Sequence, residues 1–189
     1  SVDVMVCSFF GVHPFSIASA WDPQSPRLSF ITKALGDHTR ALPELLRPGR
    51  EVTVEGPYGR FDFEDGRARQ IWVGAGIGIT PFVARMQQLA RRGGPRAQVD
   101  LFHATAQRDE AALARLRADA AAAGIRLHVL VDAEDGLLDG ERIRRLVPDW
   151  AQASLWFCGP GGFGRALHAD FAARGLPARA FHQELFQMR

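Results

Sequence analysis

From about Gln70 to the C-terminus, the chain alternates short apolar runs with amphipathic segments, and this alternation limits the folds open to it. The apolar runs, which we predict to be strands, are 70–73, 99–104, 127–131, 155–158 and 180–184. The amphipathic segments, which we predict to be helices, are 81–92, 109–123, 139–146 and 162–174. Strands that alternate with helices pair in parallel through right-handed crossovers. The sequence therefore predicts a doubly wound parallel α/β domain over residues 67–189.

The first third of the chain has a different pattern, in which short β-type runs are separated by turn residues. These predicted strands are 2–10, 13–20, 28–35 and 51–55. One helix is expected over 39–46, because Thr39 can cap its start and Pro48-Gly49 can end it. We therefore expect a small antiparallel sheet or barrel over residues 1–66, with the domain boundary near Asp65-Gly66-Arg67.

The composition excludes several classes of protein. Hydrophobic residues make up 47% and charged residues 23% of the 189 residues, as is typical of a globular chain. The 23 basic and 21 acidic residues are scattered, so no nucleic-acid-binding stripe is predicted. The two cysteines lack the spacing of metal ligands, so no metal site is expected. The longest nearly apolar stretch, 71–84, is shorter than the ~20 residues that cross a bilayer.

The strongest local signal is the segment IWVGAGIGITP, residues 71–81, in which an apolar strand leads through glycines into a helix. Thr80 is placed to cap that helix, and Pro81 to open it. A helix start offers free backbone N–H groups to an anion, and glycines let a diphosphate approach closely. The segment therefore predicts a phosphate site. It is not a GxGxxG fingerprint, because Ile79 holds the third glycine position, and an ordinary tight turn is the alternative.

Three further motifs could carry chemistry or could be purely structural. In HPFS, residues 13–16, the Phe15 ring could stack on a flat heterocycle and Ser16 could hydrogen-bond its edge; the alternative is a strand with a core phenylalanine. FCGP, residues 157–160, ends a strand where ligands of α/β sheets bind, although Cys158 alone reads as a small core residue. The tail after residue 180 could cap a site or simply close the sheet.

In their order along the chain, these motifs resemble the ferredoxin-NADP reductase superfamily, and most closely its ferric reductase and NADPH oxidase branch. HPFS resembles the flavin motif of that branch, KALGDHTRAL at 33–42 its diphosphate segment and VEGPYGRF at 54–61 the end of its barrel. VGAGIGITPF at 73–82 resembles its NADPH loop. FCGP and the ELF of 184–186 resemble its nicotinamide site. The resemblance runs from about residue 11 to the C-terminus.

The resemblance implies an FAD site in the first domain, on a barrel that is incomplete at its N-terminus. Phe15 would stack on the isoalloxazine ring, and Ser16 would hydrogen-bond flavin N5. The residues implied to hold FAD are His13, Pro14, Phe15, Ser16, Thr32, Lys33, Gly36, Asp37, His38 and Thr39.

The resemblance also implies an NADPH site in the second domain, with NADH as the alternative. Its diphosphate would lie on the turn formed by Gly76, Ile77, Gly78, Thr80 and Pro81. The nicotinamide would be bordered by Cys158, Gly159, Pro160, Glu184 and the aromatic ring of Phe186, and the implied catalytic set is Ser16, Cys158, Glu184 and Phe186.

The loop after the second α/β strand should supply cations to the 2′-phosphate that distinguishes NADPH from NADH. It contains His103 and Arg108, and Arg108 is the candidate clamp for this phosphate. A solvated surface arginine is the alternative.

The implied activity is hydride transfer from NADPH to FAD. In the implied branch, electrons then pass to the haem of an upstream transmembrane domain and on to dioxygen or ferric iron. The chain would be the dehydrogenase domain of such a membrane protein, on the cytoplasmic side of the cell membrane. The alternatives are a soluble NAD(P)H-dependent reductase that serves a ferredoxin, an oxygenase or free acceptors, and a non-catalytic nucleotide-sensing module.

Overall fold

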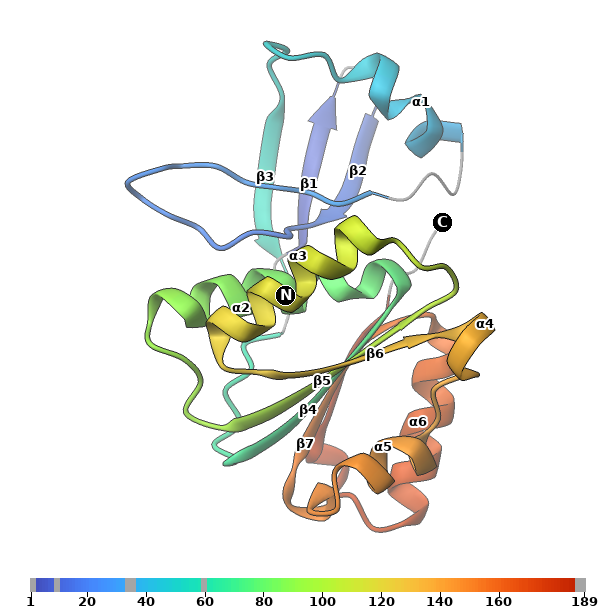
Figure 1. Ribbon diagram of the computed structural model, residues 1–189. Helices are drawn as coiled ribbons and strands as arrows, with labels where there is room; N and C mark the ends of the chain where they lie inside the picture. Colours follow the sequence, from blue (N-terminus) through green and yellow to red (C-terminus); the bar gives the residue numbers. More distant parts are fainter. Residues whose placement is uncertain (1–2, 9–10, 33–36, 59–60, 186–189) are drawn as a thin grey trace.

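A computed structural model describes residues 3–8, 11–32, 37–58 and 61–185, and these form two separate sheets (Figure 1). The first is antiparallel in the order β2-β1-β3 and contains β1 (Asp3–Ser8), β2 (Gly11–Ser16) and β3 (Thr53–Tyr58). Helix α1 (Asp37–Leu45) lies beside it. Strands β2 and β3 flank β1 without pairing with each other, so the described residues form an open sheet and not a closed barrel.

The predicted strand 28–35 does not form over its described part, residues 28–32. An isolated bridge, Ile17↔Phe30, and two hydrogen bonds of Ser29, with Ala18 N and Ser19 Oγ, join this segment to the region after β2 without forming a strand. The side chains of Ser29, Ile31 and Thr32 are exposed. A β-type run without a covering layer on either face gains too little burial to extend its pairing. The antiparallel character of the first region is confirmed, while this strand was predicted wrongly.

The second sheet is parallel, as the sequence predicted, and has the strand order β6-β5-β4-β7-β8. Its strands are β4 (Arg69–Ala75), β5 (Gln98–Thr105), β6 (Arg126–Val131), β7 (Ser154–Gly159) and β8 (Phe181–Leu185). The chain winds outward from β4 to β6 and then returns to the other side of β4 with β7. The strand order therefore reverses between β4 and β7, and ligands of open α/β sheets bind at the carboxyl ends of such a pair.

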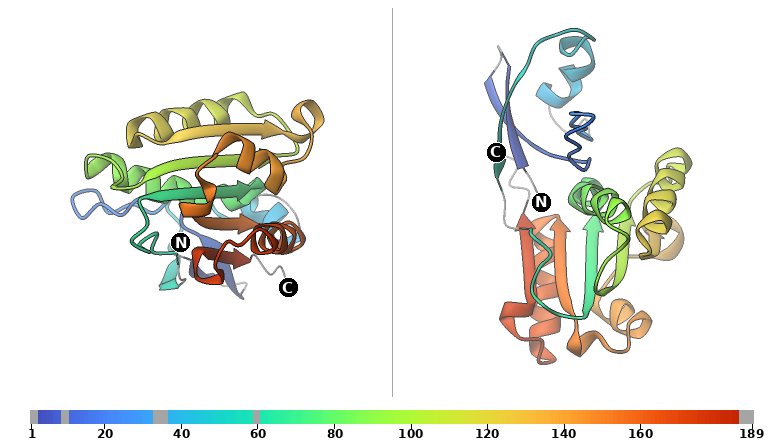
Figure 2. Two further views of the ribbon diagram at one scale, coloured as in Figure 1. Left: turned by 90° about the horizontal axis from the view of Figure 1, so that it is seen from below. Right: turned by 90° about the vertical axis from the view of Figure 1, so that its left-hand side faces the viewer.

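Helices cover both faces of the parallel sheet (Figure 2). Helices α2 (Thr80–Arg91) and α3 (Glu110–Ala123) lie on one face, and α5 (Gly140–Leu146) and α6 (Gly161–Ala173) on the other. Asp109 and Asp139 cap α3 and α5 by accepting hydrogen bonds from the backbone N–H three residues further on. Three short 3-10 turns, η1 (Gly76–Ile79), η2 (Trp150–Gln152) and η3 (Ala178–Ala180), and one short helix that was not predicted, α4 (Asp132–Asp135), complete the described part.

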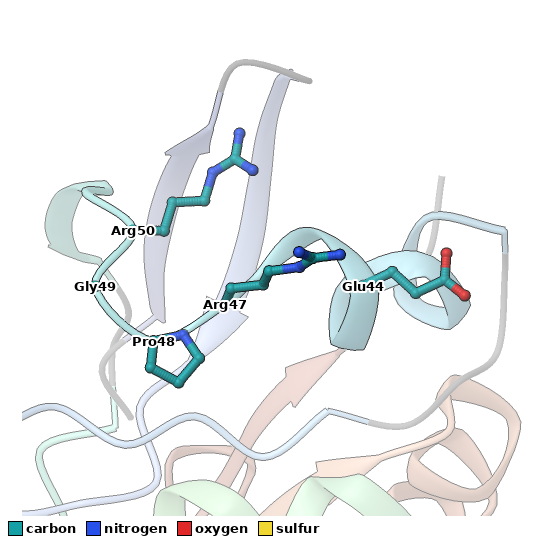
Figure 3. Close-up of a pocket in the computed structure, with 5 residues that line it drawn as sticks. All are labelled: Glu44, Arg47, Pro48, Gly49 and Arg50. Carbon is teal, nitrogen blue, oxygen red and sulfur yellow. The ribbon is translucent and has the colours of Figure 1, made fainter.

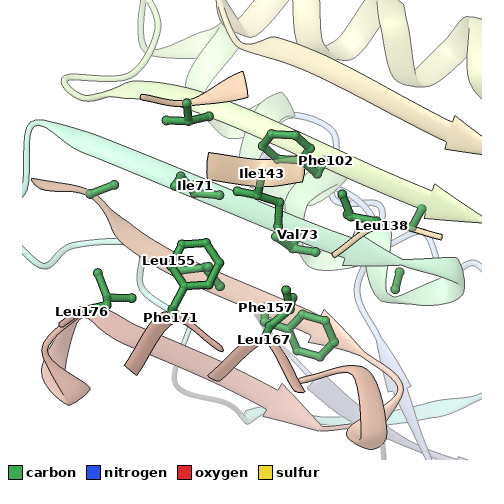
Figure 4. Packing of buried hydrophobic residues seen from close by; sticks show 14 of the residues in the cluster. Ile71, Val73, Phe102, Leu138, Ile143, Leu155, Phe157, Leu167, Phe171 and Leu176 are labelled. Carbon is green, nitrogen blue, oxygen red and sulfur yellow. The ribbon is translucent and has the colours of Figure 1, made fainter. Parts of the chain in front are cut away.

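The central strands are buried on both faces because successive side chains enter different cores. Ile71 and Val73 of β4 pack with residues of α5 and α6, as Figure 4 shows. Trp72 between them packs with α2 and α3. All three side chains are at most 1% exposed, and burying a side chain of this size stabilises by about 1.5 to 3 kcal/mol.

Two phenylalanines anchor the segment before β4 to the second core. The Phe61 ring lies 5.4 Å from Trp156, and the Phe63 ring lies 4.8 Å from Trp72, measured between centroids. Phe63 has a φ of +59°, which is unfavourable for a residue with a Cβ. Gln70 Nε2 donates to the Phe63 carbonyl at 3.0 Å and thereby holds this conformation. The segment that joins the two sheets is thus packed on the parallel sheet, and the predicted boundary near residue 66 stays a prediction.

A buried carboxylate connects three strands near their amino ends. Asp100 of β5 is 0% exposed and lies 2.6 Å from Nη2 of Arg69 in β4 and 2.6 Å from Nε2 of His128 in β6. Arg126 is 3.5 Å away. Burial raises the pKa of Asp100, but the hydrogen bond from His128 and the charge of Arg69 outweigh it and hold the pKa below its ordinary value. The carboxylate therefore stays ionised and balances the cations around it.

We expect Asp100→Asn to lower the free energy of unfolding at pH 7 by about 3 kcal/mol, because it leaves Arg69 with only the half-exposed Asp149 as counter-charge. The pKa of Asp100 is depressed, so its contribution is complete above the ordinary value of about 3.9 and is lost as the pH falls through the folded-state pKa. Urea unfolding between pH 7 and pH 2 should thus show a weaker acid dependence in the variant. Glu51→Gln, at an exposed carboxylate, is the control. A variant as stable as wild type at pH 7 would contradict the assignment.

Candidate cofactor site at the carboxyl ends of the parallel strands

The turn after β4 retains the anion-binding features expected from its sequence. The 3-10 turn η1 follows β4 directly and runs into α2. Gly76 opens this turn with a φ of +57°, and a Cβ at this position would meet nothing within 4 Å. Glycine adopts this conformation without steric cost. The first N–H groups of the turn have no intrahelical acceptor, and Gly76 is exposed, so the start of the turn can approach a diphosphate.

Thr80 plays a different part from the one predicted for it. Ile79 precedes α2 in a helical conformation, so α2 has no extended N-cap residue. The Thr80 hydroxyl donates to the Ile77 carbonyl at 3.2 Å, and the side chain is fully buried. The N-cap prediction was wrong because η1 continues into α2 without the extended residue that side-chain capping requires. Thr80 therefore closes the turn from within, and Pro81 is the second residue of α2, one position later than predicted.

Gly78 brings the turn after β4 into contact with the end of β7. A Cβ on Gly78 would lie 2.2 Å from the Cys158 carbonyl oxygen and 2.9 Å from the Gly159 Cα. A Cβ on Gly159 would in turn lie 2.8 Å from the Cβ of Ala75. These are distances that side chains cannot occupy, so backbone packs directly on backbone. The two turns that border the reversal of strand order are therefore fixed to each other.

Strands β7 and β8 bring together two of the predicted catalytic residues. Cys158 is paired in register with Glu184, which is half-buried. Cys158 itself is 1% exposed and belongs to the core that contains Trp72 and Trp156. The structure places Gly159 and Pro160 directly after Cys158, at the start of α6. Phe186 lies outside the described residues, so its predicted role stays a prediction.

His103 is tied to the glycine turn through the backbone. Its Nδ1 lies 2.9 Å from the Gly74 carbonyl oxygen, and since a carbonyl only accepts, the proton is on Nδ1. The side chain is 8% exposed, and burial lowers the pKa of His103 despite the opposing effect of the Gly74 hydrogen bond. The imidazole is therefore neutral at pH 7. His103 lies within β5 and not in the loop after it, where it was predicted. It contacts Gly74 of β4, two residues before η1 begins.

Arg108 lies in the loop after β5 and is paired with two carboxylates. Its Nε donates to Glu134 Oε1 at 2.9 Å and its Nη2 contacts Glu134 Oε2, while Nη1 donates to Glu110 Oε1 at 2.8 Å. The hydrogen bonds with Glu134 and Glu110 raise the pKa of Arg108 further above its already high value. The sequence missed Glu134 because it lies in the unpredicted helix α4; the acidic run DAED at 132–135 was the available signal.

The predicted flavin residues lie in the first sheet and in α1. Phe15 is half-buried and packs edge-on against Phe30 at 6.2 Å between centroids, and Ser16 is 7% exposed. His13 and Pro14 belong to the same strand, β2. Helix α1 begins at Asp37, so His38 and Thr39 lie in its first turn, and the predicted start at Thr39 was two residues late. Thr32 is exposed, and Lys33 and Gly36 lie outside the described residues.

An open hollow of about 580 Å³ lies at the opposite end of α1 from these residues (Figure 3). It is lined by Glu44, Arg47, Pro48, Gly49 and Arg50. Arg50 Nη1 donates to the Leu45 carbonyl at 3.0 Å, which satisfies a backbone acceptor at the end of α1. Among the described residues, none of those predicted to bind a cofactor borders this hollow. Among the side chains that the structure describes, no group of His, Cys, Asp and Glu is arranged to hold a metal ion.

Comparison with known proteins finds relatives of this chain among reductases. It is 37% identical over 145 residues to an NADPH oxidoreductase of Mycobacterium tuberculosis, covering 75% of this chain and 37% of that protein. It is 32% identical over 172 residues to the tert-butanol monooxygenase / tert-amyl alcohol desaturase reductase subunit of Aquincola tertiaricarbonis, covering 87% of this chain and 48% of that protein. The chain thus spans less than half the length of these relatives. No family model matches it.

The fold agrees with these relatives. The flavohem-like FAD/NAD-binding domain of nitric oxide dioxygenase from Vibrio cholerae superposes with a TM-score of 0.79 at 21% identity, over 98% of this chain and 83% of that domain. The chain belongs to the ferredoxin-NADP reductase-like superfamily of FAD- and NAD(P)-binding reductases. The superfamily expected from the motifs is therefore confirmed.

The finer expectation within the superfamily is not supported. The relatives named above are an oxidoreductase and an oxygenase reductase subunit, and neither is a ferric reductase or an NADPH oxidase. These relatives therefore support the alternative prediction, a reductase that serves an oxygenase, better than the prediction of a haem-linked membrane protein. None of the helices that the structure describes is long and apolar enough to span a membrane.

We expect Gly78→Ala to lower the free energy of unfolding by about 3 kcal/mol, because the new methyl group overlaps the Cys158 carbonyl and the backbone on either side is fixed. Gly76→Ala is the matched control in the same turn: it has free space and only its positive φ opposes it, at a cost of about 1 kcal/mol. Urea unfolding of both variants measures the difference. Equal losses would show that the two turns are not in close contact.

Proposed function

We propose that the chain is the FAD- and NAD(P)H-binding part of a reductase that takes hydride from a nicotinamide nucleotide onto FAD and passes the electrons to an oxygenase-type acceptor. The observation that carries this proposal is the pair of backbone-packed turns at Gly78 and Cys158, where the strand order reverses. The carboxyl ends of the parallel strands point toward the sheet that bears Phe15 and Ser16 (Figure 2). Both cofactor sites would then face each other.

The residues present fit a dinucleotide on the turn after β4. Gly76 is exposed at the start of η1 and has free space where a Cβ would lie, so the turn leaves room for a diphosphate. In this proposal Gly76, Ile77 and Gly78 hold the diphosphate through their backbone, and Thr80 and Pro81 shape the turn. His103 fixes the Gly74 carbonyl and so the direction in which the turn leaves β4. Arg108 remains the proposed contact for a 2′-phosphate.

The nicotinamide would lie against the ends of β7 and β8. Cys158 is buried, so it would act through its backbone and through the position it gives to Gly159 and Pro160. Glu184 sits beside it in register and would border the ring together with an aromatic residue of the tail, for which Phe186 stays the prediction. When bound, the two cofactors supply the redox chemistry, and the protein positions one ring over the other.

On the flavin side, we propose that the half-buried Phe15 ring packs against the isoalloxazine and that Ser16 hydrogen-bonds its N5. The strand β2 positions both side chains, with His13 and Pro14 before them. Residues around the start of α1, including Asp37, His38 and Thr39, are proposed to hold the FAD diphosphate, together with Thr32, Lys33 and Gly36. A helix start offers free N–H groups to such an anion.

The relatives support an electron acceptor of the oxygenase type. The Aquincola protein is named as the reductase subunit of a monooxygenase, and the Vibrio domain is part of a nitric oxide dioxygenase. We propose the same class of acceptor for this chain. A haem in a membrane domain has less support as the acceptor, because that prediction rested on the resemblance to one branch of the superfamily alone. The same holds for the predicted location at the cytoplasmic side of a membrane.

The deciding experiment is an anaerobic titration of the FAD-loaded chain with NADPH and then NADH, followed by the absorbance of oxidised flavin. We expect bleaching in the wild type and at least about tenfold slower reduction in Ser16→Ala, because a positioned hydrogen bond at the reacting atom contributes on that scale. Phe15→Ala should weaken FAD binding through the loss of ring packing. Ser25→Ala, in an exposed segment, is the control. Flavin that binds but resists both nucleotides would contradict the proposal and favour a non-catalytic module.

A further inference from the structure

The loops after β5 and β6 lie next to the proposed diphosphate turn. Ala75 at the end of β4 pairs with Ala104 of β5, and Thr105 pairs with Val131 at the end of β6. The loop that carries Arg108 and the helix α4 that carries Glu134 therefore border each other at this edge (Figure 1). In doubly wound sheets, the ribose 2′ position of a bound dinucleotide is recognised at the end of the second strand, which here is β5.

The side of Arg108 that would take a phosphate is already occupied. Its Nε and Nη2 face the two oxygens of Glu134 in a two-bond fork, and the third nitrogen, Nη1, faces Glu110. Arginine binds phosphate through the same parallel pair of N–H donors that it offers to a carboxylate. A 2′-phosphate and the Glu134 carboxylate would thus compete for one fork.

The 2′-phosphate and Glu134 would compete for Arg108 with similar strength, so a substitution of Glu134 can change the outcome. The side chains of Arg108 and Glu134 are 41% and 48% exposed, so solvent screens their attraction. Exposed ion pairs of this kind shift an equilibrium by no more than about fivefold. A phosphate dianion can displace the carboxylate, but the affinity of the site for the phosphate is reduced by the energy needed to break the Arg108–Glu134 pair.

The surrounding charges act in the same direction. The carboxylates gathered at this edge are Asp109, Glu110, Asp132, Glu134 and Asp135. Asp109 caps α3, and Asp135 accepts the N–H of Val131 at 2.9 Å, so both have a role in the backbone structure. Among the residues that the structure describes, the Glu134 side chain bonds only to Arg108. Glu134 is therefore the carboxylate that can change without disturbing a helix start.

We infer that Glu134 is a specificity-determining residue that lowers the preference for NADPH over NADH by competing with the 2′-phosphate for Arg108. The inference rests on the proposed function, since it assumes a dinucleotide on the turn after β4. The unphosphorylated ribose of NADH carries no charge at this position and does not require the paired N–H donors of Arg108. The carboxylate therefore opposes one nucleotide and leaves the other nearly unaffected.

The test is calorimetric binding of NADP⁺ and NAD⁺ to the full chain, which requires no flavin reduction. Glu134→Gln should tighten NADP⁺ binding by about fivefold and change NAD⁺ binding by less than about twofold. Glu141→Gln, which makes the same change at an exposed carboxylate that forms no ion pair with the described residues, should alter neither. An equal change for both nucleotides, no change, or the same gain from Glu141→Gln would overturn the inference.

A double-mutant cycle with Arg108→Ala tests the route of the effect. Arg108→Ala alone should weaken NADP⁺ binding more than NAD⁺ binding, and adding Glu134→Gln should then give no further gain. A gain that persists without Arg108 would overturn the competition. If the wild type bound neither nucleotide, the proposed function would fail and this inference with it. Binding of both with an unaltered ratio in Glu134→Gln would overturn only the inference.

Discussion

The backbone contact between Gly78 and the Cys158–Gly159 peptide is the constraint on which the arrangement of the site depends. It joins the turns that follow β4 and β7, and these strands lie on either side of the point where the strand order reverses. With the turns fixed to each other, the free N–H groups of η1 and the ends of β7 and β8 keep one relative position. A dinucleotide that extends from diphosphate to nicotinamide needs this rigidity, because hydride transfer tolerates little misplacement.

The segments that follow the strands of the first sheet are held against the parallel domain by contacts with α2 and with the second core. Ala20 N donates to Gln87 Oε1 at 3.2 Å, and Arg91 of α2 donates to the Trp21 carbonyl at 3.1 Å. On the other connection, Phe61 and Phe63 enter the core of the parallel sheet. Helix α2, which begins at the candidate diphosphate turn, is therefore also a support for the segment that follows β2. The two halves of the proposed site share this structural element.

The sequence was informative where local pattern decides structure. The five strands of the parallel sheet and helices α2, α3, α5 and α6 follow local patterns of apolar residues, and each was predicted to within two residues of its bounds. Three features were missed because they depend on distant contacts. The segment 28–32 lacks a partner sheet, Thr80 bonds inside a 3-10 turn, and Glu134 meets Arg108 only after β5 and β6 pair. The superfamily could be identified from motif order, whereas the branch could not, since its motifs are shared.

The buried network around Asp100 lies near the amino ends of β4, β5 and β6, whereas the glycine turns and Arg108 lie at their carboxyl ends. The parallel sheet thus separates the charges that hold its strands together from the charges of the proposed nucleotide site. Mutations in the loops after β5 and β6 can accumulate over generations without loosening that network. Substitution at the proposed nucleotide site is therefore not constrained by the charges that stabilise the scaffold.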